Sequence, residues 1–199
     1  MIGTADPIIE KMRAYNGAVD SGRLARAFEF GKVAHDGQTR ASGEPYFTHP
    51  VAVANILADM RLDEDSIITA LLHDTVEDCD VTLETLQTEF GGDVSQLVDG
   101  VTKLSRLAIK SLPSSAQAEN FRKLLMAMSE DVRVLLVKLA DRTHNMRTLS
   151  FIPKPEKRMR IARETMDIYA PLAERIGLTQ IQSELEDSAF EILNGDMRQ

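Results

Sequence analysis

The sequence predicts an all-α fold in a single domain, and three observations support this class. Apolar residues recur at helical spacing along most of the 199 residues, and no segment has the features of a confident strand. Aromatic residues make up 5% of the chain and tryptophan is absent, which is a poor composition for an all-β core. A domain of this length buries enough surface to be stable without disulfides or structural zinc, in keeping with the single cysteine.

Capping residues and helix breakers place the expected helices in order. Ser21 and Thr82 are candidate N-caps, as is one of Asp63, Asp65 or Ser66. Pro50 suits the first turn of a helix, and Gly91 and Gly177 suit helix ends. We therefore expect helices at about 21–37, 50–60, 63–73, 82–91, 92–107, 116–129, 131–149, 156–175 and 179–194.

Two segments are expected to be loops. Residues 38–49 contain Gly43 and Pro45, and residues 108–115 contain Pro113 and two serines. The second segment is a candidate for a mobile surface loop, because eight residues suit such a loop better than a domain boundary. The whole chain, 1–199, is therefore expected to form one domain.

Composition excludes several classes of protein. The net charge is −8, which argues against non-specific binding to nucleic acid. No apolar run approaches the roughly 18 residues that a membrane span needs, and the N-terminus lacks the apolar stretch of a secretory signal. We therefore expect a soluble, cytoplasmic protein that binds neither nucleic acid nor membranes.

The charge is unevenly distributed along the chain. Residues 44–100 carry a net charge of −12, whereas residues 101–163 carry +9. A metal held by acidic residues and facing a basic wall for a phosphate-bearing ligand would need such a layout. The alternative is a pair of solvated helix faces of opposite sign.

The first cluster that can carry chemistry is the run from His73 to Asp78. On a helix, Asp74 and Asp78 share one face, and so do His73 and Glu77. A His-Asp dipeptide can offer nitrogen and oxygen to one cation, and the second acidic pair could handle water. An acidic helix end with a chance histidine is the simpler alternative.

The second cluster lies on the expected helix 131–149. This helix is apolar on two sides over its first turns, which is typical of a buried, central helix. Asp141 begins a polar stripe with Asn145 and Thr148 where the apolar surround ends. A buried aspartate is rare unless it is paired or binds a ligand, so a pair with Arg142 or another neighbour is the alternative.

The third cluster is the loop from Arg40 to His49, in which Arg40 could grip a phosphate or stack on a base. A surface position is the alternative for a loop histidine such as His49. Two histidines and two aspartates would form an N₂O₂ set that suits Mn²⁺, Fe²⁺, Co²⁺ or Zn²⁺. The sequence has no nucleophile triad motif, no GxxxxGK[ST] loop and no GxGxxG motif.

Four ordered motifs resemble the hydrolase domain of the RelA/SpoT homologue family, within the all-α HD phosphohydrolases. They are RASGEPY with His49-Pro, HDTVED at 73–78, LVDGVTKL at 97–104 and LADRTHNMRT at 139–148. Segments on both sides of the last motif extend the resemblance over nearly the whole chain. Thr143 departs from the leucine that members often carry, and its place on the apolar side of the helix predicts an effect on packing alone.

The resemblance implies a metal-dependent hydrolysis of the 3′-pyrophosphate of ppGpp and pppGpp, giving GDP or GTP and pyrophosphate. It implies Mn²⁺ as the usual ion, held by His49, His73, Asp74 and Asp141. It implies catalytic roles for Glu77 and Asp78, which would orient and deprotonate water. It also implies nucleotide contacts for Arg40, Ser42, Asn145 and Thr148. No covalent cofactor is expected.

Two other functions stay open at this point. One is a non-catalytic, nucleotide-sensing regulatory domain, and the other is an HD phosphatase that acts on another nucleotide such as NADPH. Long family members continue into synthetase and regulatory domains, which we expect to be absent here. An excised N-terminal hydrolase domain or a small alarmone hydrolase would both have this length.

Overall fold

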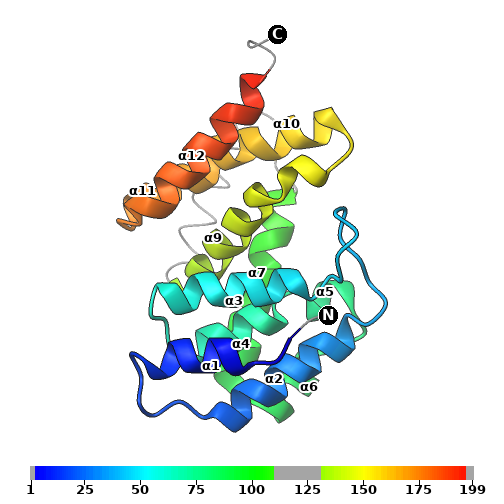
Figure 1. Cartoon of the computed structure of the whole chain (residues 1–199), viewed down its shortest axis with the longest axis vertical. Helices are drawn as coiled ribbons and strands as arrows, with labels where there is room; N and C mark the ends of the chain where they lie inside the picture. The colour runs from blue at the N-terminus through cyan, green and yellow to red at the C-terminus, as the bar shows by residue number, and fades with distance from the viewer. Residues whose placement is uncertain (1–2, 110–130, 196–199) are drawn as a thin grey trace. The chain divides into compact units, whose positions relative to one another are not determined.

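The computed structural model describes residues 3–109 and 131–195 (Figure 1). These residues form helices and loops, with a single isolated β-bridge between Thr39 and Pro45, so the predicted all-α class is confirmed. Contacts divide the chain into two compact units. The first comprises Met1–Arg40 and Glu44–Lys138, and the second comprises Ala41–Gly43 and Leu139–Gln199.

The first unit is built around two central helices, α3 (Thr48–Asp59) and α4 (Glu64–Leu72), which pack on each other. Around them lie α1 (Asp6–Arg13), α2 (Ser21–Ala34), the short α5 (Thr75–Asp78), α6 (Leu83–Phe90) and α7 (Gly92–Ile109). Every residue of α4 from Ser66 to Leu72 is buried, so this helix forms the centre of the core. His73 and Asp74 follow directly after its C-terminal end.

Glycines allow two of these helices to approach their neighbours closely. A Cβ at Gly31 of α2 would lie 2.5 Å from the Phe47 ring and 2.8 Å from the carbonyl oxygen of Leu71. A Cβ at Gly100 of α7 would lie 2.7 Å from Val134, at the start of α9 (Val132–Arg147). All three distances are shorter than a real Cβ contact, so these helix packings require glycine.

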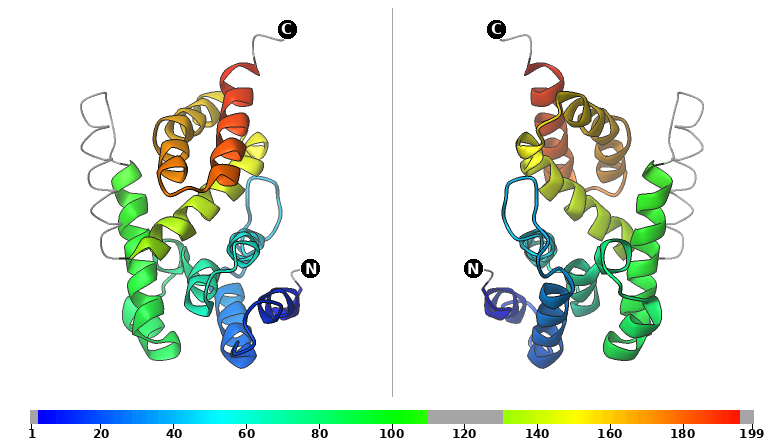
Figure 2. Two further views of the ribbon diagram at one scale, coloured as in Figure 1. Left: turned by 90° about the vertical axis from the view of Figure 1, so that its left-hand side faces the viewer. Right: turned by 90° about the vertical axis from the view of Figure 1, so that its right-hand side faces the viewer.

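The second unit contains most of α9, followed by the 3₁₀ helix η1 (Leu149–Phe151), α10 (Pro155–Glu164), the π-helix η2 (Thr165–Tyr169), α11 (Ala170–Arg175) and α12 (Thr179–Leu193). Figure 2 shows α12, in red, beside α10 and α11 in both views, and these helices are in contact. Buried residues of α12 at Ile181, Leu185 and Ala189 recur every four positions, as expected for an amphipathic helix.

The π-helix interrupts a stretch that the sequence predicts as one helix, 156–175. Pro171 has no N–H to donate to the carbonyl four residues earlier, so the regular hydrogen-bond pattern fails here. The amide of Ala170 instead donates to Thr165 O, five residues back. The helical direction is kept, and Tyr169 is fully buried at the end of the π-turn.

Two further local predictions need correction, and one helix was not predicted. The N-cap of α2 is Asp20 rather than Ser21, because the Asp20 carboxylate accepts from the amide of Arg23. Helix α3 begins two residues before Pro50, at Thr48, so the end of the predicted loop 38–49 is helical. Helix α1 was not predicted, although Pro7 in its first turn and the buried Ile8, Ile9 and Met12 are its signals.

Two predicted N-caps are confirmed, and two predicted segments extend beyond the described residues. Asp63 and Thr82 are confirmed as N-caps, through Ser66 N and Thr85 N. Residues 108–109 of the predicted loop 108–115 belong to α7, and the rest of that loop lies outside the described residues, as does the predicted helix 116–129. None of the described helices combines the length and apolarity needed to cross a membrane.

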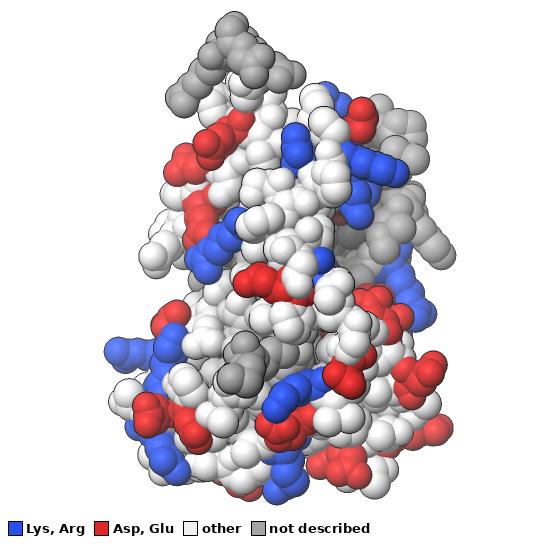
Figure 3. All heavy atoms as spheres, turned by 45° about the vertical axis from the view of Figure 1, so that its right-hand side comes forward, with Lys and Arg blue, Asp and Glu red and all other residues white. Residues whose placement is uncertain are grey.

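On one face of the molecule, the charge blocks of the sequence are not separate in the first unit. On the face shown in Figure 3, acidic and basic side chains of this unit are interspersed. Several ion pairs account for this, including Arg23 with Glu64 and Asp65, and Lys11 with Asp59.

Candidate metal centre

His73 and Asp74 occupy a break between two helices. Helix α4 ends at Leu72 and α5 begins at Thr75, whose hydroxyl donates to Leu72 O over 2.7 Å. The chain turns there, and only Thr75–Asp78 of the run 73–78 is helical. Asp74 and Asp78 nevertheless keep the expected i,i+4 relation, because Asp78 N donates to Asp74 O over 2.8 Å.

The orientation of the His73 ring is set by a backbone group. Its Nδ1 lies 2.8 Å from Ala70 O, an atom that can only accept. The proton of a neutral ring is therefore on Nδ1, and the Nε2 lone pair faces the opposite direction. Nε2 lies 3.2 Å from Asp74 Oδ1. A carbonyl that fixes the tautomer in this way is typical of metal-ligating histidines.

His49 brings a second imidazole to the same place. It lies in the first turn of α3, is 2% exposed, and its ring centroid is 5.4 Å from that of His73. Its Nε2 lies 3.8 Å from Asp74 Oδ2. The surface position considered for this loop histidine is therefore wrong, because the residue is buried beside another histidine.

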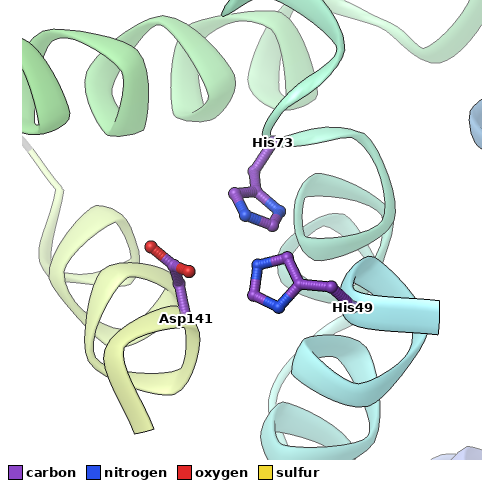
Figure 4. A group of neighbouring side chains, drawn as sticks. All are labelled: His49, His73 and Asp141. Atoms are coloured by element: carbon purple, nitrogen blue, oxygen red, sulfur yellow. The ribbon is translucent and has the colours of Figure 1, made fainter. Parts of the chain in front are cut away.

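Among the residues that the structure describes, one group of three could hold a metal ion: His49, His73 and Asp141. All three are buried, and one ligand atom from each lies within 4.8 Å of the others. Figure 4 shows the three side chains pointing toward one another. We call these residues the His-His-Asp group. Two imidazole nitrogens and a carboxylate oxygen form a donor set that suits a first-row divalent cation, so the residues fit the ion that the resemblance implies.

Asp141 is also held by its own helix. The Asn145 side-chain amide donates to Asp141 Oδ1 over 2.6 Å, one turn further along α9. Arg142, the alternative partner, instead stacks over the Tyr169 ring at 4.0 Å and forms an ion pair with Glu164 at 3.3 Å. We call Arg142, Glu164 and Tyr169 the arginine cluster. The buried Thr143 hydroxyl donates to Leu139 O, consistent with a packing role.

Glu77 and Asp78 lie on α5 beside a pocket of about 530 Å³, which is lined by residues 77–81 together with Ala34 and Gln38. The pKa of Glu77 is raised, mainly because the carboxyl group is partly buried. The positive charges of Lys138 and Arg106 lower this pKa, and the negative charges of Asp74 and Asp78 raise it. A carboxylate with a raised pKa is a better proton acceptor than an ordinary surface glutamate.

Tyr46 was not among the predicted site residues, yet it touches two of them. Its hydroxyl donates to Asp74 Oδ2 at 2.8 Å and lies 3.1 Å from Asp78 Oδ2. Burial, followed by the charges of these two carboxylates, raises the pKa of Tyr46 far above its usual value, so the phenol keeps its proton. The signal in the sequence was its position three residues before His49.

The remaining predicted residues have backbone or local contacts. Arg40 N donates to Glu44 O over 2.9 Å, which closes the loop that carries it. Ser42 lies at the tip of that loop, and the tip is grouped with the second unit. The Thr148 hydroxyl donates to His144 O over 3.1 Å. Their predicted contacts with a nucleotide stay predictions.

Comparison with known proteins identifies the family. The family model described as "HD domain" matches residues 27–179, which is most of the chain. The chain belongs to the HD domain family. A guanosine-3′,5′-bis(diphosphate) 3′-pyrophosphohydrolase of Vibrio cholerae is 57% identical over 170 residues, covering 85% of this HD domain chain and 24% of the relative. The bifunctional (p)ppGpp synthase/hydrolase SpoT of Escherichia coli is 56% identical over 171 residues, covering 86% and 24%.

A solved structure shares the fold of this HD domain. It is described as a metazoan ortholog of SpoT that hydrolyzes ppGpp and plays a role in starvation responses, and it aligns with a TM-score of 0.65 at 28% identity. The alignment covers 90% of this chain and 98% of that one. The predicted resemblance to RelA/SpoT homologues is thus confirmed. The chain spans about a quarter of the length of the curated relatives it matches.

Proposed function

We propose that this HD domain hydrolyses the 3′-pyrophosphate of ppGpp and pppGpp, with Mn²⁺ as its metal ion. The observation that carries the proposal is the His-His-Asp group, which places two imidazoles and a carboxylate within 4.8 Å of one another in a buried position. The names of the similar proteins from Vibrio cholerae and Escherichia coli support guanosine polyphosphate as the substrate class.

The residues would divide the chemistry between them. His49, His73, Asp74 and Asp141 would hold the ion, which when bound supplies Lewis-acid polarisation of the phosphate and of the attacking water. His73 is already oriented for this role by Ala70 O, and Asp141 by Asn145. Both contacts lower the cost of arranging the ligands.

Glu77 and Asp78 would handle the water. Glu77, with its raised pKa, would accept a proton as the water oxygen bonds to phosphorus and the bond to the 3′ oxygen breaks. Asp78 would orient the water, and its position is fixed from two sides. Gln38 donates to its backbone carbonyl over 3.0 Å, and the Tyr46 hydroxyl contacts its carboxylate.

The nucleotide would be held by the predicted residues Arg40, Ser42, Asn145 and Thr148. Arg40 and Ser42 lie in a loop closed by the Thr39–Pro45 bridge, which limits the conformations that the loop can adopt before a ligand arrives. For Asn145, a substrate contact would have to share the amide with Asp141.

A pyrophosphate-release assay tests the proposal. Metal-stripped protein is given ppGpp with Mn²⁺, Mg²⁺, Zn²⁺ or no metal, beside an Asp74→Ala variant. We expect Mn²⁺-dependent release of pyrophosphate and GDP that is lost in the variant. Binding of ppGpp without turnover under every metal would instead support the sensing domain, and faster turnover of NADPH would support the other phosphatase.

A further inference from the structure

Tyr46 is fixed in place by its ring as well as by its backbone. The ring stacks on His35 with a centroid distance of 4.7 Å and an interplanar angle of 24°, and it meets the edge of His49 at 6.2 Å. Its amide donates to Gln38 O over 2.9 Å. The hydroxyl therefore has little freedom to leave the two carboxylates that it contacts.

His35, which supports the ring, is itself held firmly. It is 3% exposed, and its Nδ1 lies 2.9 Å from Gln38 Oε1 and 3.4 Å from the Cys79 sulfur. The same Gln38 side chain donates to the backbone carbonyl of Asp78. His35, Gln38 and Tyr46 thus form a continuous support that reaches the end of α5.

The hydroxyl lies between two carboxylates that have different roles in the proposed reaction. Asp74 is a predicted metal ligand, and Asp78 is predicted to orient water. A phenol offers a single proton, so its contacts at 2.8 and 3.1 Å draw both anions toward one donor. Without that donor the two carboxylates would face each other and repel.

We propose that Tyr46 is a positioning residue, whose hydroxyl holds the carboxylates of Asp74 and Asp78 in fixed relation to each other. The inference rests on the proposed function and deepens it, because it couples the residue that holds the ion to the residue that orients the water. A group that orients a metal ligand in this way commonly changes metal affinity or activity by about 10–100-fold when removed.

The test compares two Tyr→Phe substitutions. Tyr46→Phe removes the hydroxyl and keeps the ring on His35. Tyr15→Phe is the matched control, because the Tyr15 hydroxyl donates to Leu62 O over 2.9 Å within the same unit, and Leu62 is not among the site residues. For both variants we would measure Mn²⁺ binding by electron paramagnetic resonance, steady-state ppGpp hydrolysis and the melting temperature.

We expect Tyr46→Phe to lower kcat by about 10–100-fold. It should also weaken Mn²⁺ binding, by no more than about 100-fold. KM should change less than about threefold, because the hydroxyl contacts the two carboxylates and not the substrate. Tyr15→Phe should change none of these three. A double-mutant cycle of Tyr46→Phe with Asp78→Asn should be non-additive, since the hydroxyl acts partly through that carboxylate.

Two results would overturn the proposal. One is a Tyr46→Phe variant with the kcat and Mn²⁺ affinity of the Tyr15→Phe control. The other is a loss that occurs only in Tyr46→Leu, which would assign the effect to ring packing. Weaker Mn²⁺ binding in Tyr46→Phe, in a protein that does not turn over ppGpp, would reject the proposed function and still support the positioning role.

Discussion

Asp141 and Arg142 are neighbours on α9 and belong to two polar clusters of opposite design. The His-His-Asp group brings together imidazole nitrogens and a carboxylate, the atoms that a cation binds. The arginine cluster contains its own cation, which stacks on Tyr169 at 4.0 Å and pairs with Glu164 at 3.3 Å. The His-His-Asp group is suited to a cation supplied from solution, whereas the positive charge of the arginine cluster is neutralised by a carboxylate of the same chain.

The comparison shows why a basic block in a sequence does not identify a phosphate site. Burial lowers the pKa of Arg142, yet Tyr169 and Glu164 outweigh burial, so the pKa of Arg142 is raised. Its side chain is 11% exposed and faces these partners. Arg147 likewise forms a two-pronged contact with Glu184. Both arginines support the second unit structurally.

The largest effect on activity should come from Glu77→Gln, because Glu77 is the proposed base for the reaction at the His-His-Asp group. Loss of a general base typically lowers kcat by about 10²–10⁴-fold, whereas the free energy of unfolding should change by less than about 0.5 kcal/mol. Steady-state kinetics and urea denaturation measure the two. Glu84→Gln, on α6, is the control. A Glu77→Gln enzyme with full kcat would remove Glu77 from the proposed mechanism.

Arg142→Met should show the reverse pattern, with stability as the main loss. Removing one partner of a buried ion pair leaves the other uncompensated, so we expect a loss of about 2–4 kcal/mol in unfolding free energy. The double variant Arg142→Met/Glu164→Leu should recover much of it, because the unpaired carboxylate is gone. Equal stability of wild type and Arg142→Met in urea would show that the arginine cluster contributes little.

Removal of metal should affect the His-His-Asp group and leave the arginine cluster unchanged. An ion that binds the native state alone stabilises it by about 2.7 kcal/mol at 100 times its Kd, so excess chelator should lower the melting temperature of the Mn²⁺-loaded protein. Activity should return when Mn²⁺ is restored. His73→Ala should show no chelator-dependent shift, and a shift that persists in this variant would place the ion elsewhere.

The smallest effect should come from Arg147→Ala. This side chain is 48% exposed and Glu184 is 33% exposed, so the ion pair is screened by water. We expect a loss of about 0–1 kcal/mol in unfolding free energy, becoming smaller at high salt. A loss as large as that of Arg142→Met would mean that exposure does not explain the difference between the two arginines.

Local signals predicted most of the helices and part of the site. Asp63 and Thr82 cap their helices through their own side chains, so residue type and position were sufficient there. His49 and His73 are 24 residues apart in sequence, and their proximity depends on the packing of α3 against α4. The residues alone left this pairing open, and the family resemblance supplied it.

Other features depend on contacts that no local pattern specifies. Tyr46 reaches Asp74 across 28 residues of sequence, and Arg142 forms its ion pair with Glu164, which lies in another helix. Asn145 was assigned to the substrate by resemblance, and the structure shows its amide on Asp141. A polar side chain with several available partners takes the one that tertiary packing brings closest.

The π-turn at Thr165–Tyr169 has the geometry of a single extra residue held within a helix. Each residue of an α-helix advances the side-chain direction by about 100°, so this extra residue resets which side of the following turn points inward. The faces of α10 and α11 are thereby set independently, although the two helices follow one another without a loop. Because Pro171 has no N–H, deleting one residue here would still leave the helix without a regular hydrogen bond at that point, and it would change the place of Tyr169 over the Arg142 guanidinium.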